Sequence, residues 1–149
     1  MIAKYMQPIQ LYVVFEKIHS NIWLSKKLNI NHTCLIVPYN WFYSINIFLK
    51  KELFLSNISL IENSAIDLSN YYSTNTLFNY KLLLNKNILL FYNYYNYFSK
   101  NKITIFILLD KFIKKIESID RVYPNSNWLE RETSEMYGIK YIWKLDTRK

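Results

Sequence analysis

Residues 127–138 read NWLERETSEMYG, and their composition differs from that of the rest of the 149-residue chain. The stretch contains the only glycine, Gly138, and the consecutive charged residues Glu130, Arg131 and Glu132. The remaining sequence consists mainly of Lys, Asn, Ile, Tyr, Phe and Leu, in a mixture that varies little along the chain. We therefore expect the specific function of the protein to depend on this stretch.

The stretch predicts a short, capped helix. Asn127 can cap the helix N-terminus, and Glu130 stands where a capping box places its glutamate. Arg131 and Glu135 are four residues apart and can pair on one helix face, while Gly138 falls where a left-handed stop is expected. The consecutive charges leave a charge on almost every side, and a charge that is buried needs a partner. We therefore expect the helix to lie between its own sheet and a neighbouring protein.

The rest of the chain predicts a mixture of helices and strands. Three segments have apolar residues at helical spacing, namely residues 5–28, 39–53 and 110–119. Five segments are rich in β-forming residues, namely residues 32–37, 57–68, 77–84, 88–95 and 103–109. The second of these strands is expected to break near residues 62–64, and residues 92–98 predict a strand followed by a turn.

This order of elements indicates an α+β fold, with a mixed, mainly antiparallel sheet, helices packed on one face and a short charged helix at the end. No linker or internal repeat interrupts the chain. We expect one domain over residues 1–149, with an N-terminal helical region over residues 1–30 and a core over residues 31–149.

Composition narrows the class of protein. An apolar fraction of 51% excludes a disordered chain, and no run approaches the roughly 18 apolar residues of a transmembrane helix. The net charge of +8 is compatible with nucleic-acid binding, but the excess lysine is spread along the chain. Abundant Lys, Asn, Ile, Tyr and Phe with little Gly or Ala indicate an AT-rich genome. A basic RNA-binding organellar protein, such as a ribosomal subunit, is the alternative that these features leave open.

No catalytic or metal-binding constellation is visible. A single cysteine, Cys34, cannot form an intramolecular disulfide or a Cys-ligated cluster by itself, and it is either a small core residue or a reactive thiol. His19 and His32 have no nearby carboxylate or thiol pattern that predicts a metal site. A glycine-rich phosphate loop and a nucleophile motif are also missing from the sequence.

From residue 128 onward the sequence resembles the signature of the 30 kDa subunit family of respiratory complex I, which includes mitochondrial NADH dehydrogenase subunit 9 and its counterpart in bacterial NADH-quinone oxidoreductase. The family pattern is roughly W-x-E-R-E-x-x-[DE]-M-[FY]-G-[IV], followed by His or Lys and then Arg. The matching residues are Trp128, Glu130, Arg131, Glu132, Glu135, Met136, Tyr137, Gly138, Ile139, Lys144, Asp146 and Arg148. The similarity weakens after Ile139 and covers about residues 30–149.

The resemblance implies a non-redox scaffold subunit in the hydrophilic arm of proton-translocating NADH:ubiquinone oxidoreductase, on the matrix side of the mitochondrial inner membrane. Partners would be the 49 kDa-type subunit and neighbouring Fe–S subunits, in a hetero-oligomer without nucleic acid. NADH, FMN, Fe–S clusters and ubiquinone would be bound by other subunits. The implied contact and signature residues are Trp128, Glu130, Arg131, Glu132, Glu135, Gly138, Lys144, Asp146 and Arg148. The AT-rich composition suggests that a mitochondrial genome encodes the chain.

Overall fold

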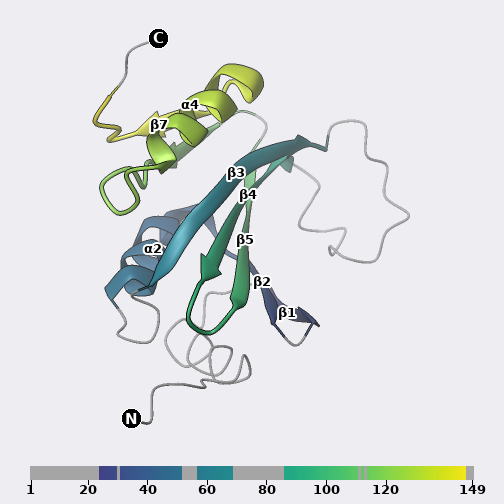
Figure 1. The fold of residues 1–149 in the computed structure, drawn as a ribbon. Coiled ribbons are helices and arrows are strands. Elements are labelled where there is room, and N and C mark those ends of the chain that lie inside the picture. The colour runs from purple at the N-terminus through teal and green to yellow at the C-terminus, as the bar shows by residue number, and fades with distance from the viewer. Residues whose placement is uncertain are drawn as a thin grey trace.

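A five-stranded mixed sheet forms the centre of the domain (Figure 1). The computed structural model describes residues 24–29, 31–51, 57–68, 86–110, 112 and 114–146. The strands are β1 (Leu24–Asn29), β2 (His32–Ile36), β3 (Ile58–Asp67), β4 (Lys86–Asn96) and β5 (Asn101–Asp110). Their order is β1-β2-β5-β4-β3, and only the β2–β5 pair is parallel. The predicted mixed, mainly antiparallel sheet is therefore confirmed.

Two helices and a second small sheet complete the described structure. A 3-10 turn, η1 (Tyr39–Trp41), leads into α2 (Phe42–Lys51), and α4 (Ser126–Tyr137) is the last helix. Strands β6 (Lys115–Glu117) and β7 (Lys140–Ile142) pair in parallel on either side of α4 in the sequence. In Figure 1, α4 and β7 lie together at one end of the large sheet, away from β1 and the β4–β5 turn. Within the described residues, no helix is long and apolar enough to cross a membrane.

Both helices pack on the same face of the sheet. The ring of Phe42 in α2 lies 4.5 Å from the ring of Tyr92 in β4, measured between centroids. Tyr92 pairs with Asn63 of β3, and directly paired residues project from the same face of a sheet. The Asn63 side chain in turn contacts Thr133 of α4, with 3.5 Å between Asn63 Nδ2 and Thr133 Oγ1. The prediction that the helices cover one face is confirmed.

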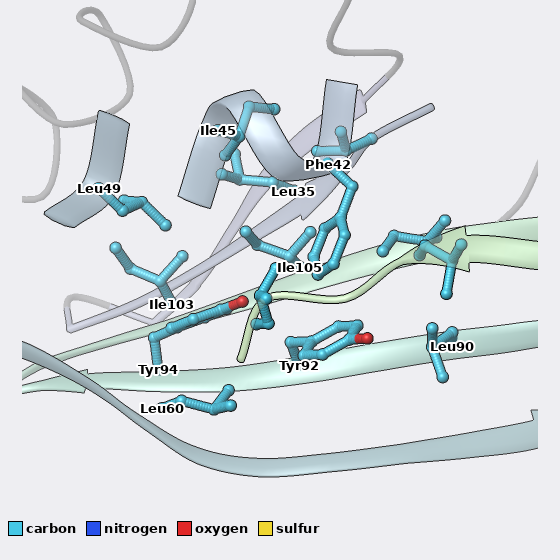
Figure 2. Packing of buried hydrophobic residues seen from close by; sticks show 14 of the residues in the cluster. Leu35, Phe42, Ile45, Leu49, Leu60, Leu90, Tyr92, Tyr94, Ile103 and Ile105 are labelled. Atoms are coloured by element: carbon cyan, nitrogen blue, oxygen red, sulfur yellow. The ribbon is translucent and has the colours of Figure 1, made fainter. Parts of the chain in front are cut away.

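The core follows from the alternation of residues along the two central strands. Leu90, Tyr92 and Tyr94 of β4 point to the same side as alternate isoleucines of β5, and α2 packs on them (Figure 2). The Tyr94 hydroxyl donates to Asn46 Oδ1 of α2 over 2.6 Å, and Asn46 Nδ2 donates to the Phe42 carbonyl over 2.8 Å. These buried polar groups therefore have partners, as groups removed from water require.

Three sequence-based predictions were wrong in the described residues. The expected opening helix includes residues 24–28, but these lie in β1, because the chain reverses at once and pairs with β2. The helix expected over residues 110–119 is replaced by the end of β5 and by β6, which is held by β7 from the far side of α4. Strand β3 does not break near residues 62–64, because a register shift between Leu60 and Glu62 lets its pairing with β4 continue.

The other predicted elements agree with the structure where it describes them. Residues 32–37, 88–95 and 103–109 are largely strand, residues 39–51 are helical, and residues 92–98 form a strand followed by a turn. The strand expected at residues 77–84 and the opening helix over residues 5–23 lie outside the described residues.

Candidate functional site

The inner face of α4 buries a carboxylate. Glu130 is 0% exposed, its Oε2 accepts a hydrogen bond from Ser118 Oγ over 2.6 Å, and its Oε1 accepts one from the Ile119 N–H over 2.9 Å. The helix begins at Ser126, so Asn127 lies inside its first turn. The predicted Asn127 cap and the Glu130 capping box are therefore wrong. Glu130 is satisfied within the domain and is not available to a partner protein.

The environment of Glu130 also changes its acidity. Burial raises the pKa of Glu130 to about 7, although the hydrogen bonds from Ser118 and Ile119 oppose the rise. The positive charge of Lys144 also favours the ionised form, while the negative charge of Asp120 adds to the rise. The carboxylate therefore changes its charge close to neutral pH while it remains inside the fold.

A second polar cluster joins α4 to both sheets. The Tyr141 hydroxyl of β7 lies 2.7 Å from Thr133 Oγ1 of α4 and accepts a hydrogen bond from Asn63 Nδ2 of β3 over 3.2 Å. Thr133 Oγ1 also reaches the carbonyls of Leu129 and Glu130, each over 3.1 Å. If Tyr141 donates to Thr133, Thr133 can donate to a carbonyl, and both hydroxyls are used. The cluster fixes the rotation of α4 about its axis, which decides which residues face outward.

The outer face of α4 carries charged and aromatic side chains. Trp128 is 74% exposed, and the Arg131 guanidinium lies 5.7 Å from the centroid of its ring. Arg131 Nε also pairs with Glu135 Oε1 over 3.1 Å, as the spacing predicts. Glu132 is exposed beside them. Trp128, Arg131, Glu132 and Glu135 are therefore the signature residues that the structure brings together on one surface.

The residues after β7 are held against α4 by polar contacts. Lys144 Nζ donates to the Asn127 carbonyl over 2.9 Å, and the Leu145 N–H donates to Asp120 Oδ2 over 2.7 Å. Lys144 is thus turned towards the domain, and Asp146 is partly exposed. Arg148 lies outside the described residues. Sequence reasoning missed Ser118 and Asp120, because no local pattern marks them as partners of residues so far along the chain.

Gly138 ends α4 in a left-handed conformation, with φ of 68°, and its N–H donates to the Ser134 carbonyl over 2.9 Å. The predicted helix stop is confirmed. A Cβ at this position meets no atom within 4 Å, so only the backbone conformation opposes a side chain.

We expect Gly138→Ala to lower the free energy of unfolding by about 1 kcal/mol, because an L-residue resists a left-handed conformation. Gly138→Asn is the matched control and should lose less, since asparagine tolerates this conformation better than alanine. Urea unfolding measures both. An alanine variant as stable as the wild type contradicts the interpretation.

The opposite face of the sheet carries a chain of hydrogen bonds that includes His32. Asn93 Nδ2 donates to Glu62 Oε2 over 2.9 Å, and Thr104 Oγ1 donates to Asn93 Oδ1 over 2.6 Å. Because the only hydroxyl hydrogen of Thr104 is already donated to Asn93, the histidine must be the donor in the 2.8 Å contact between His32 Nε2 and Thr104 Oγ1. Nε2 therefore cannot act as a base towards the Cys34 thiol 3.8 Å away, and burial raises the pKa of that thiol. The geometry favours a core thiol over a reactive one.

These features define the class of protein. It is a small α+β domain that fixes its last helix through a buried carboxylate and a hydroxyl cluster and leaves charged and aromatic side chains on the outer face of that helix. A family model described as respiratory-chain NADH dehydrogenase, 30 Kd subunit, matches residues 36–149, and the chain belongs to this family. The resemblance inferred from residues 128–148 is thereby confirmed.

Two relatives agree with this assignment. The chain is 36% identical over 141 residues to NADH-ubiquinone oxidoreductase subunit 9 of Paramecium primaurelia and 33% identical over 142 residues to that of Paramecium tetraurelia. Each match covers 95% of this chain and 66% of the relative, so the chain spans just under two thirds of their length.

Two solved structures share the fold. A trypsin-resistant fragment of Nqo5 superposes with a TM-score of 0.72 at 13% identity, covering 91% of this chain and 98% of the fragment. A chain of the membrane-bound sulfane sulfur reductase, an archaeal respiratory membrane complex, gives a TM-score of 0.69 at 14% identity and covers 94% and 77%. At these identities the likeness is one of fold.

Proposed function

We propose that the chain is a non-redox scaffold subunit in the hydrophilic arm of proton-translocating NADH:ubiquinone oxidoreductase. The observation that carries the proposal is the division of the family signature between the two faces of α4. Glu130 is locked inside the domain, whereas Trp128, Arg131, Glu132 and Glu135 are presented together on the outside. A helix that is held rigidly within the domain and keeps an organised outer surface suits a contact between subunits.

The wider assignments are those that the signature resemblance implies, and the names of the relatives, which are NADH-ubiquinone oxidoreductase subunits, support them in general terms. The proposed partners are the 49 kDa-type subunit and neighbouring Fe–S subunits, which together with this chain would form a hetero-oligomer. The proposed location is the matrix side of the mitochondrial inner membrane, and the proposed gene is mitochondrial. In this assignment NADH, FMN, the Fe–S clusters and ubiquinone are bound elsewhere, and the chain contributes no catalytic residue.

The contact residues are proposed individually. Trp128, Arg131, Glu132 and Glu135 would meet a partner directly, since they share the outer surface of α4. Gly138 and Lys144 would shape this surface, Gly138 by ending α4 and Lys144 by holding the following segment against Asn127. Asp146 and Arg148 remain proposed contacts on the strength of the signature alone.

The RNA-binding alternative depends on the net charge of +8 and the aromatic content. Neither feature is concentrated at the signature surface, where two glutamates accompany one arginine. RNA binding with a steep dependence on salt concentration would favour this alternative.

Arg131→Glu tests the contact role. Because Arg131 pairs with Glu135 on a partly exposed surface, the reversal should cost the isolated domain less than about 1 kcal/mol. In the assembled complex the same change removes the arginine and its contacts with Trp128 and Glu135 from the proposed interface, and we expect about tenfold less chain in the complex. Native gels stained for NADH dehydrogenase activity and probed for the chain measure this fraction.

Arg121→Glu is the matched control, because Arg121 is an exposed arginine in the loop before α4 and undergoes the same change of charge. This variant should assemble normally. Equal assembly of the two variants contradicts the contact role of Arg131. A wild-type chain that never migrates with NADH dehydrogenase activity contradicts the proposed function itself.

A further inference from the structure

The segment after β7 exposes large apolar side chains, although hydrogen bonds hold it against the domain. We call residues 143–145 the hook. Trp143 is 72% exposed and Leu145 is 68% exposed, while Lys144 between them turns back to the Asn127 carbonyl. The hook therefore presents its apolar residues to solvent and directs its charged residue towards the domain, which is the reverse of the usual arrangement.

The backbone of the hook is also strained. Trp143 has φ of 65°, a left-handed conformation that costs a bulky L-residue free energy. Such conformations persist only where the surroundings impose them, and they concentrate at functional sites. Here the surroundings are the Lys144–Asn127 hydrogen bond and the bond from the Leu145 N–H to Asp120, which is itself a buried residue.

The hook adjoins the outer face of α4. Its bond to Asn127 holds it against the first turn of the helix, the turn that carries Trp128. From Trp128 an exposed stripe continues along α4 through Glu132 to Met136, residues that stand four apart and so lie on one helix face. Hook and stripe therefore both start at the first turn of α4, the hook with exposed Trp143 and Leu145 and the stripe with exposed Trp128, Glu132 and Met136.

The outer face of α4 has a charge opposite in sign to that of the chain, and Lys144, the cation of the hook, is directed to the Asn127 carbonyl. Glu132 and Glu135 give two negative charges and Arg131 gives one positive charge, so the outer face of α4 carries a net charge of −1 in a chain of net charge +8. The exposed Glu132 carboxylate, beside the Arg131–Glu135 pair, disfavours anionic phosphates of nucleic acid or membrane at this point and attracts basic protein side chains.

We infer that the hook and the α4 stripe form one docking surface for a partner protein that offers Lys or Arg side chains to Glu132 and an apolar pocket to Trp143 and Leu145. This inference rests on the proposed function and specifies the chemistry of the partner. An exposed Trp on a backbone that two neighbouring hydrogen bonds hold suits the role of a buried anchor, because less backbone freedom remains to be lost on binding.

Site-specific photo-crosslinking in the assembled complex tests the inference. The photoreactive residue p-benzoylphenylalanine replaces Trp143 in one chain, Glu132 in a second and Phe98 in a control. Phe98 is 79% exposed in the β4–β5 turn, at the end of the sheet away from α4 (Figure 1). Crosslinks from the first two positions to one partner protein, in peptides that contain Lys or Arg, are the expected result.

Trp143→Ala should also reduce the amount of the chain found in the complex about tenfold, whereas Phe98→Ala should leave that amount unchanged.

Other outcomes overturn the inference in distinguishable ways. A chain that assembles but crosslinks from Phe98 and not from the hook or the stripe overturns the docking surface and leaves the proposed function standing. Crosslinks to nucleic acid, or to partner peptides without basic residues, overturn the stated partner chemistry. A wild-type chain absent from the NADH dehydrogenase complex overturns the proposed function, and the inference fails with it.

Discussion

Lowering the pH from about 8 to about 5 is expected to stabilise the domain by about 2.5 kcal/mol through Glu130 alone. The reason is that burial raises the pKa of this carboxyl from 4.5 to about 7. Between these two values the folded state holds a proton that the unfolded state has released. The free energy of unfolding contributed by Glu130 is therefore fully present below pH 4.5 and is lost as the pH rises through about 7.

Glu130→Gln should remove this dependence, because a glutamine amide has nearly the same shape and no charge to bury. Its oxygen can still accept from the Ile119 N–H, and its nitrogen can donate to Ser118 Oγ once that hydroxyl rotates. The free energy of unfolding of the variant should equal that of the wild type near pH 5. Near pH 8 it should be higher than that of the wild type by about 2 to 3 kcal/mol. Urea unfolding followed by tryptophan fluorescence across this pH range gives both profiles.

Glu132→Gln is the matched control, since Glu132 lies on the same helix and is exposed. Its profile should run parallel to that of the wild type. If the Glu130→Gln profile is also parallel to the wild type, Glu130 does not titrate near neutrality and its proposed burial energetics are wrong.

Glu130 also shows how far the sequence could predict the candidate site. The density of charge in residues 130–132 indicated that some charges need partners, and one of them proved to be buried. Which one it was depended on how α4 is rotated about its axis against the sheet, and contacts of Thr133 with Asn63 and Tyr141 set that rotation. The partners, Ser118 and Ile119, lie next to β6, a strand of three residues that exists only because β7 pairs with it. No local pattern encodes such a non-local contact.

The large sheet was more predictable because its central strands are long and rich in β-forming residues. In β4 and β5 long runs of β-forming residues, bounded by Asn and Lys, made the strands visible in the sequence. The short strand β1 has no comparable pattern, and it forms by tight reversal onto β2. Low glycine and proline content removed the usual signals for such boundaries.

Phe42→Ala is expected to have the largest effect on folding, with a loss of about 3 to 5 kcal/mol in the free energy of unfolding. Phe42 is 0% exposed, and its ring packs against Tyr92 at the start of α2. Truncation removes this apolar area and leaves a cavity between helix and sheet, which the tightly packed isoleucines of β5 can fill only in part. The total free energy of unfolding of a domain of this size is only about 5 to 15 kcal/mol, so the variant should unfold at much lower urea concentrations than the wild type.

Phe98→Ala provides the matched control, since it deletes the same side chain from an exposed turn and should change stability by less than about 0.5 kcal/mol. Both substitutions delete the same side chain, so any difference in stability between them comes from the position of the phenylalanine. The composition of a chain with nine phenylalanines does not show which of them are buried. The sequence distinguished the two residues by context, because Phe42 fits the helical spacing of residues 39–53 and Phe98 ends a run rich in Tyr and Asn. Equal losses from the two substitutions would show that α2 does not cover the core as described.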